Sequence, residues 1–163
     1  MTAYDVAQIC ENGHVTNDSV KGKPQRNQKY CEHCGKPTIT KCPKCNTPIR
    51  GHLYSPHITL LDSIDAPRFC IACGNPFTWF ETKVNAAKEL AGMHKDLNDK
   101  ERELLKKSFD DLIEDNAKSE VAAIKIKPIL LNKLKQGAQD TLYRFAIDVA
   151  SETSKKILMG NDM

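Results

Sequence analysis

The second half of the chain shows apolar residues at helical spacing, beginning near residue 80. Thr78 and Glu81 have the spacing of a capping box, which predicts a helix running to about residue 93. Asn98 and Glu101 repeat this spacing and predict a second helix of about 16 residues, with one densely charged face. The apolar stripe of the second helix consists of Leu105, Phe109, Leu112 and Asn116.

A third helical segment covers residues 119–136, which are rich in Ile and Leu. Pro128 has no backbone N–H to donate, so it should kink or divide this helix. Gly137 is then expected to end the segment. Together with the two preceding helices and a final one, this predicts a bundle of three or four helices.

The final predicted helix, from residue 138 to about 158, is apolar on two sides. One stripe holds Leu142, Phe145, Val149, Thr153 and Ile157, and the other holds Tyr143, Ile147, Ala150, Ser154 and Leu158. A helix in a small bundle needs a single apolar stripe of about 100°. Packing of Leu142, Phe145 and Val149 inward would leave the side chains of Tyr143, Ile147 and Leu158 exposed as a contact surface. The alternative is that neighbouring helices cover both stripes.

The first half of the chain has a different pattern, with short stretches typical of strands. Tyr4, Val6 and the pair at residues 8 and 9 alternate, and residues 57–61 are rich in β-forming side chains. The predicted fold is therefore α+β, with a pair of ribbons made of short β-hairpins followed by the helical bundle of three or four α-helices. The boundary predicted from the change in composition separates residues 1–80 from residues 81–163.

The cysteines predict that both are zinc ribbons, since all seven fall in four short motifs. Three motifs are C-x-x-C knuckles, and the fourth pairs a cysteine with a histidine four residues later. Soft thiolates with one imidazole suit a tetrahedral zinc ion, and one tight turn can present two such ligands. Gly35, Asn46 and Gly74 follow the knuckles, where the turn needs a positive φ. The eight predicted ligands are Cys10, His14, Cys31, Cys34, Cys42, Cys45, Cys70 and Cys73.

An internal repeat indicates which motifs share a metal ion. Residues 30–37 recur 39 positions later as residues 69–76, each with an aromatic residue, C-x-x-C-G, one residue and Pro. If each copy closes one ribbon, the first site holds the ligands at 10, 14, 31 and 34, and the second holds those at 42, 45, 70 and 73. Two alternatives remain open, namely an interleaved cross-brace and a second site in which His52 or His57 replaces Cys70 or Cys73.

The same motifs resemble those of a family of small bacterial proteins with tandem zinc ribbons, defined as a domain of unknown function. The resemblance covers residues 4–10, 12–14, 30–37, 40–43, 48–51 and 70–79, and it continues into residues 149–158. It supports the eight ligands and implies a bacterial cytosolic setting. It implies no activity.

Charge and composition narrow the expected partners. The 163-residue chain has a formal net charge of +3, but seven thiolates binding two zinc ions would make it about neutral. Such a protein has no global attraction to nucleic acid. The N-terminal residues lack a secretory signal pattern, and no stretch approaches the roughly 18 apolar residues of a membrane span. The expectation is a soluble protein of a reducing cytoplasm.

The sequence shows no P-loop, dinucleotide turn, Ser/His/Asp set or open metal site, which predicts a non-enzymatic protein without catalytic residues. The leading hypothesis is an interaction platform or adaptor that binds another protein, or a second copy of itself, through the C-terminal helix. The alternative is nucleic-acid binding by basic residues of the hairpins. These residues are Lys21, Lys23, Arg26, Lys29, Lys41, Lys44 and Arg50.

Overall fold

A computed structural model describes residues 3–54, 63–133 and 136–160. The chain forms two compact units, Met1–Glu81 and Thr82–Met163. Short antiparallel strands occupy the first unit and helices the second, which confirms the α+β class. No helix in the described ranges is long and apolar enough to cross a membrane.

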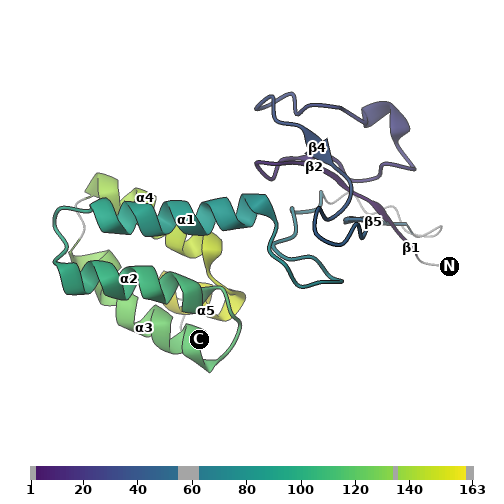
Figure 1. Cartoon of the computed structure of the whole chain (residues 1–163). Coiled ribbons are helices and arrows are strands. Elements are labelled where there is room, and N and C mark those ends of the chain that lie inside the picture. Colours follow the sequence, from purple (N-terminus) through teal and green to yellow (C-terminus); the bar gives the residue numbers. More distant parts are fainter. Residues whose placement is uncertain (1–2, 55–62, 134–135, 161–163) are drawn as a thin grey trace. The chain divides into compact units, whose positions relative to one another are not determined.

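The strands of the first unit form two small antiparallel sheets (Figure 1). One sheet has the order β3-β2-β4, with β2 in the centre, and in the other β1 pairs with β5. The strands are β1 (Ala3–Val6), β2 (Gln8–Cys10), β3 (Val15–Asn17), β4 (Thr38–Ile39) and β5 (Arg50–Tyr54), with a short 3₁₀ helix, η1 (Pro24–Arg26). The strand predicted at residues 57–61 lies outside the described residues.

The pairing of β1 with β5 links the two ribbons, because β1 precedes Cys10 of the first site and β5 follows Cys45 of the second. The amide of Ala7, between β1 and β2, donates to the carbonyl of Ile49 at 2.9 Å. Gly51 allows this close approach, since a Cβ there would lie 2.4 Å from the carbonyl oxygen of Asp18 and 2.7 Å from the carbonyl carbon of Val6. The ribbons therefore share backbone hydrogen bonds.

The small apolar core of the first unit includes aromatic residues around the start of helix α1 (Thr78–Met93). The rings of Phe77 and Trp79 stack at 4.5 Å, and the indole N–H of Trp79 donates to the carbonyl of Pro67. The predicted capping box does not begin this helix, because Thr78 is a helical residue and not the N-cap. Thr78 lies inside the first turn, and the amide of Glu81 donates to the carbonyl of Phe77.

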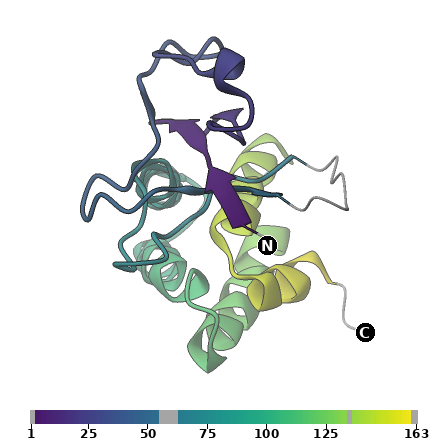
Figure 2. The same ribbon diagram turned by 90° about the vertical axis from the view of Figure 1, so that its right-hand side faces the viewer.

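The second unit contains five helices in its described part, counting α1, against the three or four predicted. The others are α2 (Asp99–Leu112), α3 (Ala117–Asn132), α4 (Gln136–Val149) and α5 (Glu152–Met159). Helices α2 and α3 pack side by side (Figure 1 and Figure 2). The apolar core of this unit includes buried side chains from α2, α3, α4 and α5. They are Leu105, Phe109, Leu112, Ile126, Leu130, Leu142 and Leu158.

The capping box at Asn98 and Glu101 is confirmed, with both hydrogen bonds present. Asn116, predicted on the stripe of α2, instead lies beyond that helix and caps α3. Helix α3 runs through Pro128 without being divided. Pro128 is exposed, so water can reach the carbonyl that lacks its helical donor. Gly137 does not end this helix, because α3 stops at Asn132 and Gly137 belongs to α4.

The single final helix predicted from residue 138 to 158 is divided into α4 and α5. The side chain of Ser151 caps α5 by accepting from the amide of Ser154, and the Ser151 amide donates to the carbonyl of Leu112 at 2.8 Å. Because of this break, the residues after Ser151 do not continue the stripes predicted for a single helix. Leu158, predicted to lie outside, is therefore buried, whereas Phe145, predicted inside, is half-buried.

Candidate metal centres

Three of the four ligand motifs have the same backbone. In each knuckle the first cysteine receives a hydrogen bond at 2.8 or 2.9 Å from the amide four residues later. That amide belongs to Gly35, Asn46 or Gly74, with φ values of 70°, 61° and 69°. Positive φ turns the chain so that both cysteines face the same point. The predicted role of these three residues is confirmed.

The first motif makes a wider turn between Cys10 and His14. The Cys10 amide donates to the carbonyl of His14 at 3.0 Å, and Gly13 has a φ of 86°. A Cβ on Gly13 would meet the side chain of Trp79 at 3.0 Å. Gly13 therefore provides both the turn and the space for the indole that packs against it.

The first site brings together Cys10, His14, Cys31 and Cys34, whose ligand atoms all lie within 4.8 Å of one another. Cys10 Sγ is 3.5 Å from His14 Nδ1 and 3.7 Å from Cys34 Sγ. Cys31 Sγ is 3.6 Å from the same nitrogen. With Zn–S bonds of about 2.3 Å and a Zn–N bond of about 2.1 Å, tetrahedral geometry separates two sulfurs by about 3.8 Å and sulfur from nitrogen by about 3.6 Å. The spacing fits zinc.

The second site brings together Cys42, Cys45, Cys70 and Cys73 within the same limit. Cys42 Sγ lies 3.8 Å from Cys73 Sγ, and Cys45 Sγ lies 3.6 Å from Cys70 Sγ. These are the sulfur separations of a zinc tetrahedron. The sequential pairing of motifs is therefore confirmed, and the interleaved alternative is wrong.

Four of the five histidines lie in the described part of the chain, and among these only His14 belongs to a tetrad. His14 is the imidazole of the first tetrad, whereas His33 is exposed, with its ring centre 5.7 Å from that of His14. The second tetrad is complete with four cysteines, so His52 is not needed there. His57 lies outside the described residues. His94 is buried beyond α1, where its carbonyl accepts from the guanidinium of Arg102.

Hydrogen bonds from the residue two places after each knuckle stabilise a thiolate. The backbone N–H of Lys36 lowers the pKa of Cys34 to about 6. The side chain of Asn75, together with its backbone N–H, lowers the pKa of Cys73 to about 6. Such outer hydrogen bonds favour the deprotonated ligand that zinc binds.

Thr47 holds the corresponding position in the middle knuckle. Its hydroxyl lies 3.2 Å from Cys45 Sγ and, with its backbone N–H, lowers the pKa of that thiol. Sequence reasoning missed this set of outer donors, at residues 36, 47 and 75. The only signal was the constant spacing, because a backbone N–H requires no particular side chain.

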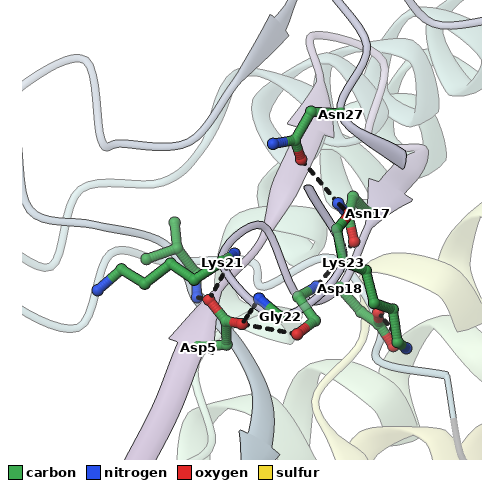
Figure 3. Close-up of polar contacts among 9 residues, drawn as sticks. Asp5, Asn17, Asp18, Lys21, Gly22, Lys23 and Asn27 are labelled. Carbon is green, nitrogen blue, oxygen red and sulfur yellow. Dashed lines mark hydrogen bonds and ion pairs between the residues drawn. The ribbon is translucent and has the colours of Figure 1, made fainter. Parts of the chain in front are cut away.

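A cluster of polar contacts holds the loop between the two halves of the first site (Figure 3). This cluster was not predicted from the sequence. The Asp5 carboxylate accepts hydrogen bonds from the Ser19 hydroxyl at 2.6 Å and the Gly22 amide at 2.9 Å. The side-chain amide of Asn17 donates to Asn27 Oδ1 at 2.7 Å. These contacts hold residues 19–27, which lie between ligands His14 and Cys31 in the sequence, close to β1 and β3.

Both tetrads have four protein ligands, which is the arrangement of structural zinc sites. They differ in accessibility. The first has two buried cysteines, a half-buried Cys34 and an exposed imidazole, whereas the second exposes both Cys45 and Cys73. Bound thiolates would give the first site a charge of about −1 and the second about −2.

Residues 3–158 match the sequence profile of a family described as "Uncharacterized protein conserved in bacteria (DUF2321)". The match spans both units, so the chain belongs to this bacterial family. No curated protein and no solved structure was found to match the chain.

Proposed function

We propose that this member of the DUF2321 family is a non-enzymatic zinc protein whose helical unit binds another protein. The two zinc sites supply stability to the ribbons. Each offers four protein ligands, whereas catalytic zinc sites keep a position for water or substrate. Binding of another protein is then expected at surfaces away from the zinc sites.

The observation that carries the proposal is an open groove of about 470 Å³ beside α4. Its lining includes Tyr143, Phe145, Ile147 and Met159, with Arg144 and Asp148. Met159 is 55% exposed. Apolar side chains gathered around an open groove are typical of a binding surface, because water contact with them is unfavourable. Tyr143 and Ile147 were predicted to form such a surface.

The test replaces Ile147 with Glu and compares it with Asn85→Glu, which adds the same charge at an exposed position of α1. Proteins captured from the native host are identified by mass spectrometry, and molecular mass is measured by light scattering. We expect Ile147→Glu to lose a partner, or a second copy of the chain, that Asn85→Glu retains. Circular dichroism should show both variants folded. Equal capture and equal mass would contradict the proposal, as would unfolding of Ile147→Glu, which indicates a closed core.

A second candidate function is nucleic-acid binding by the ribbons. Tyr30 is 56% exposed, and the ammonium of Lys29 lies 5.6 Å from its ring centre, which is a combination suited to a stacked base and a phosphate. Two of the other basic residues are engaged within the protein, since Lys23 pairs with Asp18 and Arg50 stacks on Tyr4. A mobility shift assay with nucleic acid at about 50 mM salt tests this candidate function, because phosphate contacts are strongest at low salt. Absence of binding there would remove this candidate.

A further inference from the structure

Helices α2 and α3 enclose a second groove of about 390 Å³, separate in its lining from the one beside α4. Leu104 and Ser108 from α2 and Ala122 from α3 line it. Ser108 and Ala122 are buried, so the groove reaches the packing layer between the helices. Small side chains at these positions leave room for a larger apolar group from outside.

The exposed side of α3 continues this apolar surface. Val121, which also lines the groove, is 48% exposed, and Ile124 is 60% exposed. Pro128 is exposed as well. These residues are three and four positions apart, so they lie along one face of the helix. An apolar row of this spacing matches the contact seam that one helix presents to another.

Three lysines surround the groove: Lys107 from α2, and Lys118 and Lys125 from α3. None of them forms a salt bridge with a residue that the structure describes, whereas Lys88 and Lys106 of the same unit are paired with Asp110 and Glu103. Asp111 is the acidic residue of the lining. The groove thus combines an apolar centre with a predominantly basic rim.

We propose that this surface binds an amphipathic helix of another protein that carries acidic residues on both sides of an apolar stripe. The apolar stripe would cover Val121 and Ile124 and enter the groove, while its carboxylates would pair with the lysines. A second copy of this chain fits poorly, since a symmetric contact would place the same lysines opposite one another. Nucleic acid fits poorly too, because the groove offers neither an arginine nor an aromatic ring among its described lining residues.

The inference rests on the proposed protein-binding function and adds to it a second surface, besides the groove beside α4, with a stated partner chemistry. The probe is a synthetic 16-residue peptide, equal in length to α3, with Leu at heptad spacing and Glu on both flanks. One control peptide has the same composition with the Leu positions scrambled, and another has Lys in place of Glu. Each is titrated against the full zinc-loaded chain by fluorescence anisotropy.

The matched protein variants are Lys118→Glu with Lys125→Glu, and Lys95→Glu with Lys100→Glu, which change the same charge at exposed positions away from the groove. We expect saturable binding of the acidic peptide, weakened at least about tenfold by the first pair and less than about twofold by the second. The scrambled and basic peptides should bind at least about tenfold more weakly. Methyl NMR shifts should centre on Val121 and Ile124.

Four results would overturn the inference. These are absence of saturable binding, equal affinity for the scrambled peptide, equal weakening by the two variant pairs, and stronger binding of a single-stranded oligonucleotide or anionic vesicles to the same lysines. A native partner that is lost with Ile147→Glu but kept with Lys118→Glu and Lys125→Glu would leave the protein-binding function intact while rejecting this surface.

Discussion

The two units of this protein are stabilised in different ways. The ribbon unit has strands of two to five residues and a small apolar core around Ile9, Ile49 and Trp79, together with the cysteines. The helical unit buries large side chains such as Leu105, Phe109 and Ile126 completely. A core as small as that of the ribbons normally needs a metal or disulfide, whereas packed helices do not. The comparison indicates that metal and apolar burial supply the folding free energy of separate parts of the chain.

Removal of zinc should have the largest effect on folding stability, and the ribbon unit should be the part that unfolds. Structural zinc contributes about 10–16 kcal/mol of binding free energy in zinc-finger peptides near neutral pH. Chelation is therefore expected to unfold the ribbon unit while most of the helical circular dichroism remains. Trp79 fluorescence should shift to the red as the indole loses its contact with Gly13. Complete loss of helicity would show that both units depend on one core.

Replacement of Cys70 with Ser tests whether the two metal sites depend on each other. We expect the bound zinc to fall from two ions to one, because only the second tetrad loses a ligand. Elemental analysis of protein purified without chelator measures this directly. Cys10→Ser provides the reciprocal control at the first tetrad. Loss of both ions in either variant would mean that the β1–β5 pairing couples the sites so tightly that neither forms alone.

A core truncation in the helical unit should leave the metal sites intact. Phe109 is fully buried, and Phe109→Ala is expected to cost about 3–5 kcal/mol of unfolding free energy. Denaturant unfolding followed by circular dichroism measures the loss, and the zinc content should stay at two ions. Ile124→Ala is the control, since that side chain is largely exposed and should change stability little. A drop in zinc content for Phe109→Ala would contradict the separation of the units.

Two glycine substitutions, one in each unit, should have small effects of opposite sign. In Gly51→Ala the new Cβ meets backbone atoms of Asp18 and Val6, so we expect a loss of about 1–3 kcal/mol from the ribbons. In Gly92→Ala the nearest atom is Lys106 Cε at 3.0 Å, the end of a flexible side chain. Helix propensity then favours Ala by up to about 1 kcal/mol. Thermal unfolding of the zinc-loaded chain measures both, and a stabilising Gly51→Ala would refute the close approach.

Features that depend on a few neighbouring residues could be predicted from the sequence. The ligand motifs, the positive φ of Gly35, Asn46 and Gly74, and the cap at Asn98 were all predictable, since each is closed by contacts within a few positions. The pairing of the tetrads was predictable for a different reason. A repeat with constant internal spacing reveals the unit that is repeated, even though the ligands are far apart along the chain.

Features that arise between distant segments could not be predicted from the sequence and became visible in the fold. The pairing of β1 with β5 joins residues about 50 positions apart and has no local signal. The break between α4 and α5 depends on a hydrogen bond from Ser151 to Leu112 and another from Ser154 to Ser119. Helical periodicity continues across that break, so the sequence suggested one helix. Hydrogen bonds donated to carbonyls of α2 and α3 make the divided form stable, because they satisfy polar groups that a continuous helix would arrange differently.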